Sequence, residues 1–253
     1  MSNTIYRPQD DPRFAHPVID QDKWQERYLA NGVTIPYRYI HGYFEGTDVK
    51  FSFCFPPKEK YENRFHHYLS PFPGPDEEMA SIGHTGYEDR IGFALSCGAY
   101  FVETNMGSPS QFGAHRDDFL TWQSSAAAAE FSRETAMKIY ETDQRPYGYV
   151  YGGSGGGYKT MACVENTQAW DGGAPFVIGS PASLPNTITM HVQGQRVLRN
   201  AFGKIIDALD AGGSGDPYAA LNQDEADMLR ELTRMGFPPL AWYLEANGVI
   251  DAG

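Results

Sequence analysis

The chain has 253 residues, of which 41% are hydrophobic and 21% are charged, a composition that supports a packed core and excludes general disorder. It carries 32 Asp and Glu against 20 Lys and Arg, a formal charge of -12, and its basic residues are scattered. Nucleic acid is repelled by such a charge, so we expect no nucleic-acid partner. No apolar run reaches the roughly 20 residues of a membrane span, and the N-terminus lacks the apolar stretch of a secretory signal, so we expect no membrane partner either.

The cysteines indicate the redox state. Cys54, Cys97 and Cys163 are an odd number at wide spacing, without the short repeats of a zinc site. They predict reduced thiols in a cytoplasmic protein, and not a disulfide framework.

The N-terminal part predicts an arm followed by a hairpin. We interpret residues 1–40 as a polar, proline-interrupted arm with one short helix around 20–30. The end of the arm overlaps the first of two extended segments, 33–44 and 48–55, which are separated by a turn containing Gly46. Apolar residues alternate in the second segment, so the pair predicts an antiparallel hairpin.

From residue 64 onward, predicted strands alternate with predicted helices. The expected order is strand 64–69, helix 87–97, strand 99–103, helix 117–142, strand 147–151, helix 155–167 and strand 174–178. This alternation is typical of a mainly parallel sheet covered by helices on both faces. The predicted fold class is therefore α/β, with an antiparallel hairpin before the parallel units.

The last 70 residues lose the strand pattern. Helices are expected over 188–209 and 222–235, and a short one over 240–246. Asn222, with Glu225 three residues later, forms a capping-box-like start for the second of them.

One motif carries chemistry, in the stretch YVYGGSGGGYKT at 149–160. It contains a G-x-S-x-G sequence centred on Ser154, between a predicted strand and a predicted helix. In this context the serine occupies a sharp turn, and the glycines let neighbouring backbone pass without a Cβ clash. Its hydroxyl then projects above the sheet, where the N–H groups of the helix start face an anion that forms beside it.

Two other interpretations of this motif are open. A glycine-rich turn can be only a flexible connection. The stretch from Gly153 to Thr160 also resembles the phosphate loop G-x-x-x-x-G-K-[ST], but that loop needs glycine where Tyr158 stands. We interpret Lys159 as a charge on the helix surface that points away from Ser154.

The motif, followed by TQAWDGGAPFVIGSPASLP, resembles the α/β-hydrolases and is most similar to the tannase and feruloyl esterase group. The resemblance covers about 44–182; residues 171–173 and 179–182 stand where that group has F-D-G-I-x-x-G-A-P-A, and 103–107 resemble the turn after its fourth strand. Gly153 stands where the group has a disulfide-bonded cysteine, so we do not expect that bridge. The resemblance implies that 41–182 form the N-terminal part of the hydrolase core and 183–253 a helical lid.

The resemblance implies a serine esterase that acts on a small-molecule carboxylic ester without a cofactor or metal. Ser154 is then the nucleophile of an acyl-enzyme mechanism. The N–H of Gly155 is one oxyanion donor, and the other comes from the loop after the third strand, 70–74. Phe72 is the first candidate there and Ser70 the next, since the two prolines of the loop have no N–H.

The general base is not explained by this sequence. In this fold the order is serine, acid, histidine, and the single histidine after Ser154 is His191, within the expected lid. We therefore expect the acid and the histidine from sequence beyond residue 253, or from a second chain that completes the sheet. The alternative is a non-catalytic binding module on a degenerate hydrolase scaffold.

The remaining histidines have a minor place in this prediction. His84, His115 and His191 are expected on loops that open toward the active-site end, as possible substrate contacts or as surface residues. The others are interpreted as structural: His16, His41, His66 and His67.

Overall fold

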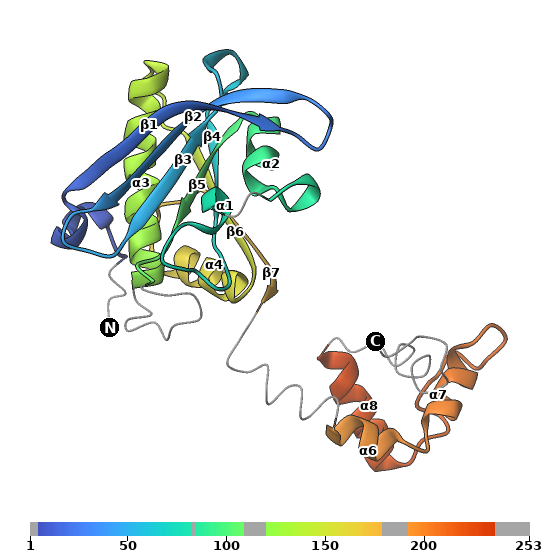
Figure 1. The fold of residues 1–253 in the computed structure, drawn as a ribbon. Coiled ribbons are helices and arrows are strands. Elements are labelled where there is room, and N and C mark those ends of the chain that lie inside the picture. Colours follow the sequence, from blue (N-terminus) through green and yellow to red (C-terminus); the bar gives the residue numbers. More distant parts are fainter. Residues whose placement is uncertain (1–4, 82–83, 109–119, 179–191, 236–253) are drawn as a thin grey trace. The chain divides into compact units, whose positions relative to one another are not determined.

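The computed structural model describes residues 5–81, 84–108, 120–178 and 192–235, and the chain divides into two units, 1–180 and 181–253. Figure 1 shows the fold as a ribbon. The expected helix at 240–246 lies outside the described residues. Among the described helices, none is long and apolar enough to cross a membrane.

The first unit is built on a mixed sheet with seven strands in its described part, in the order β1-β2-β3-β5-β4-β6-β7. The strands are β1 (Pro17–Tyr28), β2 (Thr34–Phe44), β3 (Lys50–Phe55), β4 (Arg64–Tyr68), β5 (Ala99–Thr104), β6 (Tyr147–Ser154) and β7 (Gly172–Ile178). β1, β2, β3 and β5 pair antiparallel in succession, whereas β4 is parallel to β5 and β6, and β6 is parallel to β7. The antiparallel hairpin and the parallel units after it are confirmed.

The helix expected around 20–30 is wrong, because these residues form most of β1. β1 pairs with β2 along its length, and its polar side chains are mainly exposed at the edge of the sheet. Pairing with a distant strand decides this conformation, and the local polar pattern does not show it. Residues 17–28 and 34–40 of the segment interpreted as an arm are thus part of the sheet.

Helices cover both faces of this sheet (Figure 1). One face packs on α3 (Leu120–Tyr140) and α4 (Gly155–Asn166), and the other on α1 (Glu78–Ser81) and α2 (Arg90–Ser96). Short 3-10 helices lie at η1 (Pro8–Asp10), η2 (Pro12–Phe14), η3 (Lys58–Lys60) and η4 (Gly86–Glu88). The alternation of β3 divides its side chains between the two faces: Phe51 and Phe53 pack on the α3 side, and Cys54 packs on the α2 side.

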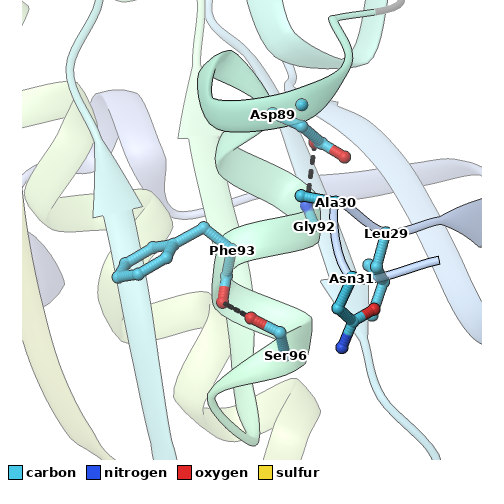
Figure 2. A pocket seen from close by; sticks show the side chains of 8 residues that line it. Leu29, Ala30, Asn31, Asp89, Gly92, Phe93 and Ser96 are labelled. Carbon is cyan, nitrogen blue, oxygen red and sulfur yellow. Dashed lines mark hydrogen bonds between the residues drawn. The ribbon is translucent and has the colours of Figure 1, made fainter. Parts of the chain in front are cut away.

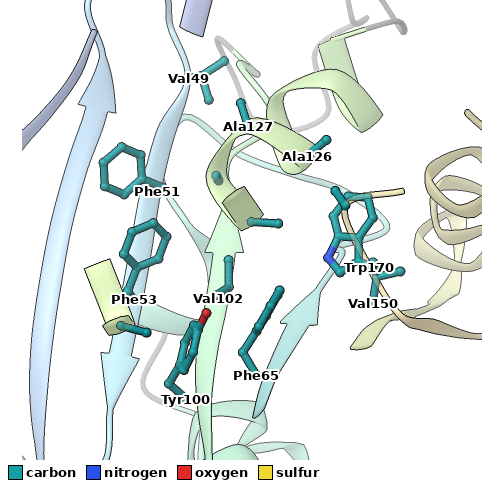
Figure 3. Packing of buried hydrophobic residues seen from close by; sticks show 14 of the residues in the cluster. Val49, Phe51, Phe53, Phe65, Tyr100, Val102, Ala126, Ala127, Val150 and Trp170 are labelled. Atoms are coloured by element: carbon teal, nitrogen blue, oxygen red, sulfur yellow. The ribbon is translucent and has the colours of Figure 1, made fainter. Parts of the chain in front are cut away.

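The core on the α3 side combines large aromatic residues with small ones (Figure 3). Phe51 and Phe53 stack with ring centroids 4.8 Å apart, and Phe65 stacks on Tyr100 at 5.0 Å. The alanine run 126–129 of α3 is fully or almost fully buried, so the helix backbone lies close to the sheet. This packing fixes the central strands, whose carboxyl ends carry the loops described below.

The second unit contains α6 (Gln195–Leu198), α7 (Phe202–Leu209) and α8 (Gln223–Arg234) in its described part. The long helix expected at 188–209 is thus divided, with a break before α7. The capping box of α8 is confirmed, since Asn222 and Glu225 exchange side-chain and backbone hydrogen bonds. Buried leucines and isoleucines from all three helices form a separate apolar cluster.

Candidate active site

The turn between β6 and α4 has a strained backbone at Ser154. This residue has φ 54° and ψ -120°, the last strand residue is followed at once by the helix at Gly155, and the serine side chain is exposed. A positive φ is costly for a residue with a Cβ, and it is retained where the surrounding structure imposes it. The sharp strand–turn–helix predicted from the motif is therefore present.

The glycines of the motif are required by close approach of backbone. A Cβ on Gly156 would lie 2.1 Å from the carbonyl oxygen of Leu69, and one on Gly152 would lie 2.7 Å from the same oxygen. A Cβ on Gly153 would lie 2.5 Å from the ring of Phe176 on β7. The backbone contacts exclude side chains at Gly152 and Gly156, and a side chain at Gly153 would have to displace the Phe176 ring, so the motif lets β6, α4 and the loop after β4 meet at one point.

The loop after β4 lies against the start of α4. The Leu69 N–H donates to the Tyr151 carbonyl at 2.9 Å, which extends the parallel pairing of β4 and β6 toward the turn. The Pro71 carbonyl oxygen lies 3.0 Å from the position of a Cβ on Gly155. The two segments expected to supply the oxyanion donors are thus in contact.

The interpretation of Lys159 as a helix-surface charge is wrong. Its side chain is buried, and its Nζ donates to the carbonyl oxygens of Ser70 at 2.9 Å and Pro71 at 3.3 Å. The missing side chains of Gly155 and Gly156 allow the loop to lie close enough to α4 for this contact. This geometry also directs the ammonium to protein carbonyls, which argues against a phosphate loop.

The two expected oxyanion donors lie on segments that contact each other, but their N–H groups differ in their hydrogen-bond partners. Gly155 is the first residue of α4, where the N–H has no intrahelical acceptor. The Phe72 N–H donates to the Ser70 hydroxyl oxygen at 3.1 Å, and the Phe72 side chain is exposed. An oxyanion that binds Phe72 must share this N–H with Ser70 or displace it. The donor roles remain predictions.

A side-chain amide binds the neighbouring loops together. The Nδ2 of Asn105, which follows β5, donates to the carbonyl oxygens of Asp48 at 2.9 Å and Pro75 at 3.1 Å. Its Oδ1 accepts from the N–H groups of Lys50 and Gly107. Asn105 thus fixes the far end of the loop at 70–75 to β3 and β5. The sequence motifs did not reveal this role.

Buried carboxylates hold α1 against the sheet. Both oxygens of Glu103 accept from the Met79 N–H, at 3.1 and 2.9 Å, and the Ala80 N–H also donates to this carboxyl group. Complete burial raises the pKa of Glu103 well above its usual range, and the nearby charge of Glu77 raises it further. Sequence patterns gave no signal for this anchor, because a glutamate in a strand is ordinarily exposed.

A hydrogen-bonded chain continues from this anchor toward the sheet edge. Glu77 accepts from the Ser52 hydroxyl at 2.6 Å, and its Oε1 lies 3.4 Å from Nε2 of His41. Asp20, where the β1–β2 register is irregular, binds the other ring nitrogen of His41. The hydrogen bonds with Glu77 and Asp20 raise the pKa of His41 to about 9 despite partial burial.

The histidines expected at the site are not brought to Ser154 by the described contacts. His84 lies near Glu78 and Glu88, at 3.9 and 3.7 Å, and its carbonyl accepts from Arg27. The other two candidates, His115 and His191, lie outside the described residues. Within the described part of the chain, no imidazole or carboxylate hydrogen-bonds the Ser154 hydroxyl.

Of the two histidines of β4, His67 is buried in the sheet and His66 is half-buried. Burial lowers the pKa of His66 to about 4, and that of His67 to about 3. His66 stacks on Phe93 of α2, and His67 packs edge-on against Trp170. These neutral rings fit the structural role expected for them.

A pocket of about 220 Å³ lies beside α2, away from the turn (Figure 2). Asp89 and Ser96, on its wall, already have partners: Asp89 accepts from the Gly92 N–H and pairs with Arg27, and Ser96 donates to the Phe93 carbonyl. The pocket is lined by Leu29, Ala30, Asn31, Gly86, Asp89, Gly92, Phe93 and Ser96. None of these residues belongs to the serine turn or the loop at 70–75.

Comparisons with solved structures identify the fold. The rice cell wall degrading esterase LipA from Xanthomonas oryzae matches with a TM-score of 0.50 and 11% identity, over 84% of this chain and 62% of that one. Tannin acyl hydrolase from Aspergillus niger matches at 0.45 and 16%, over 76% of this chain and 38% of that one. Candida Antarctica lipase A matches at 0.41 and 14%, over 69% and 46%. No protein-family model and no curated protein matches the sequence.

The chain therefore has the α/β-hydrolase fold, as the motif predicted. The LipA match and the sheet order carry this assignment, since the other two matches are weaker. The chain spans less than two thirds of the length of each of these structures.

Proposed function

We propose that this chain is the nucleophile-bearing part of a serine-dependent hydrolase that acts on a small-molecule carboxylic ester. The observation that carries this proposal is Ser154 itself, an exposed serine held at positive φ between a strand and a helix start. Such strain clusters at functional sites, and at Ser154 it coincides with the strand–turn–helix context of the G-x-S-x-G motif. The named activities of the similar structures, an esterase, a tannin acyl hydrolase and a lipase, agree with ester chemistry.

The proposed reaction is acyl transfer through the serine hydroxyl. The Ser154 oxygen attacks the ester carbonyl, its proton passes to a general base, and the N–H groups of Gly155 and Phe72 bind the oxyanion. The base returns the proton to the leaving alcohol, and an acyl-enzyme remains. Water then attacks the acyl-enzyme with the help of the same base, which releases the acid and restores Ser154.

We further propose that the acid and the histidine come from sequence beyond residue 253 or from a second polypeptide that completes the sheet. Within the described residues, β7 pairs on one side with β6, and Phe176, Val177 and Ile178 are 44%, 82% and 46% exposed. An apolar strand edge of this kind favours the addition of another strand. The helices of 183–253 are proposed as a lid.

The free thiols of Cys54, Cys97 and Cys163 support a reducing compartment, the cytoplasm, as the proposed location. Two of these thiols, Cys54 and Cys163, are completely buried, and burial raises their pKa. They are thereby kept as protonated, unreactive groups. Alkylation of the native and the unfolded protein, followed by mass measurement, tests whether all three remain reduced in the purified material.

The test of the proposed activity is fluorophosphonate labelling of the complete native protein, with its intact mass measured in parallel. We expect labelling at Ser154 that is abolished in Ser154→Ala, while Ser96→Ala, which alters an exposed serine on α2, retains the label. An additional mass identifies a completing polypeptide. Absence of label on material without a second polypeptide would contradict the esterase and support a non-catalytic binding module.

A further inference from the structure

Lys159 occupies an unusual place for a lysine, inside the contact between α4 and the loop after β4. Only 9% of the residue is exposed, and its Nζ donates to two consecutive carbonyl oxygens, those of Ser70 and Pro71, at 2.9 and 3.3 Å. Lysine is rarely buried, because removing its charge from water is costly unless polar groups compensate. The buried ammonium group of Lys159 must therefore be stabilised by its hydrogen bonds to this loop.

The two carbonyls belong to the segment that precedes the expected oxyanion donor. The C=O of Pro71 and the N–H of Phe72 share one peptide plane and point in opposite directions when the bond is trans. A donor that holds the Pro71 carbonyl therefore also fixes the direction of the Phe72 N–H, which donates to the Ser70 hydroxyl oxygen at 3.1 Å. The Nζ of Lys159 thus fixes the rotation of this peptide as well as its distance from the helix.

The contact also fixes the loop relative to the nucleophile. The Pro71 oxygen lies 3.0 Å from the Cβ position of Gly155, the residue after Ser154. Lys159 is on the same helix as Gly155, five residues after the serine. Helix α4 begins with one expected donor, Gly155, and Lys159 of the same helix binds the loop that supplies the other, Phe72. The two donors are thereby held in a fixed arrangement.

We propose that Lys159 is a positioning residue that holds the oxyanion loop in register with the serine turn. The inference rests on the proposed function, since an oxyanion loop has a role only if Ser154 forms an acyl-enzyme. Lys159 is not the general base in this proposal, because its ammonium protons are directed to the Ser70 and Pro71 carbonyls. Its effect is on the geometry in which the transition state is bound.

The experiment uses the complete native protein and 4-nitrophenyl butyrate as the probe substrate. Lys159→Met keeps the length of the side chain and removes its donors. We expect kcat to fall by up to about 10²-fold, the loss typical of one oxyanion donor, with KM changed little. Lys159→Arg, which restores donors to both carbonyls, is expected to recover most of kcat.

Two controls separate positioning from other roles. Lys58→Met removes an exposed lysine, with 65% side-chain exposure, and should leave the kinetics unchanged. Binding of a boronic acid, which forms a tetrahedral adduct with the serine, should weaken in Lys159→Met in parallel with the fall in kcat/KM, while binding of the product butyrate stays the same. A merely structural role would affect both ligands.

A second variant keeps the proposal testable if Lys159→Met does not fold. Pro71→Gly loosens the same peptide without touching the lysine, and we expect the same fall in kcat at unchanged KM. Where Lys159→Met does fold, its effect and that of Pro71→Gly should not be additive in the double variant, because both act on one peptide.

Three outcomes overturn the inference. Unchanged kcat and boronic acid binding in Lys159→Met show that the contact does not position the donor. Full loss of activity in Lys159→Arg, with normal folding, instead assigns a base role to the lysine. A KM effect without a kcat effect assigns it to substrate binding. If the wild-type protein is neither labelled by fluorophosphonate nor active, the proposed function itself has failed.

Discussion

The segment that joins β4 to α1 is held at its two ends in different ways. Its first residues, Ser70 and Pro71, are held by glycine-dependent backbone contact and by one lysine. Its last residue, Glu77, accepts a hydrogen bond from Ser52, and Met79 of the adjoining α1 donates to the buried carboxyl group of Glu103. The end beside the candidate nucleophile thus depends on shape together with one ammonium group, and the distant end depends on carboxylates and an imidazole, and so on protonation.

This difference indicates which change disturbs which end. A contact between backbones has no tolerance for an added methyl group, but it does not respond to pH. A network of carboxylates and an imidazole tolerates small changes of shape, yet its free energy changes with each proton bound. Substitutions of the glycines at the first end should therefore act through sterics, and those of the carboxylates and the imidazole at the second end through pH-dependent stability.

The largest effect is expected from Gly156→Ala at the first end. The new Cβ would lie 2.1 Å from the Leu69 carbonyl oxygen, so β4 or α4 has to move. We expect the free energy of unfolding to fall by about 3 kcal/mol, the upper end of the usual cost of overpacking, and fluorophosphonate labelling to be lost. Urea unfolding and the labelling rate measure the two effects.

Gly203→Ala is the matched control, because a Cβ there meets nothing within 4 Å and the residue lies in α7. It should raise helix stability by up to about 1 kcal/mol, since alanine has the higher helix propensity. If Gly156→Ala is as harmless as this control, the steric account of the first end is wrong.

Sequence reasoning succeeded where local residues determine the structure. The serine turn could be predicted because a strand, the glycines around Ser154 and a helix are adjacent in the sequence. The hairpin β2–β3 was likewise visible from the alternation in β3 and the turn before it. Local patterns therefore identified the serine turn and the fold class.

Sequence reasoning failed where a distant segment determines the environment of a residue. The residues of β1 have the polar pattern of a surface segment, and they form a strand through pairing with β2. Lys159 has the sequence context of a surface helix residue, but a loop about 90 residues earlier covers it. Glu103 is buried because Met79 supplies an N–H to it. None of these contacts can be predicted from a short stretch of the sequence.

An intermediate effect is expected from Glu103→Leu at the second end. Removing the carboxylate leaves the buried Met79 N–H without this acceptor, which typically costs about 2 kcal/mol. Glu103→Gln keeps an acceptor oxygen and should cost less. Urea unfolding of both variants at neutral pH tests this order, and equal stabilities of the two variants would show that the hydrogen bond to Met79 is unimportant.

A comparison of the wild-type protein with Glu103→Gln reports the protonation of Glu103. Because burial raises the pKa of this carboxyl group in the folded state, the folded protein binds its proton more tightly than the unfolded chain does. The wild-type protein should therefore gain stability relative to Glu103→Gln as the pH falls toward the ordinary carboxyl pKa. A constant difference between them would contradict the raised pKa.

The smallest effect is expected from His41→Gln, which removes the imidazole between Glu77 and Asp20. Its pKa is raised from 6.5 to about 9 in the folded protein, so its stabilising contribution is complete below 6.5 and is lost as the pH rises through about 9. Because the network lies partly open to solvent, we expect a difference of only about 1 kcal/mol between the two limits. Urea unfolding of wild type and variant at about pH 6 and about pH 10 measures it.

His16→Gln provides the same chemical change at an exposed histidine and should leave the pH dependence as in the wild type. If His41→Gln behaves like this control, the imidazole contributes no charge to the second end. If the pH dependence disappears in His41→Gln while the labelling rate of Ser154 is unchanged, the two ends of the segment are energetically separate. A fall in the labelling rate would instead show that protonation at the distant end reaches the loop beside the nucleophile, and the division between shape and charge would have to be abandoned.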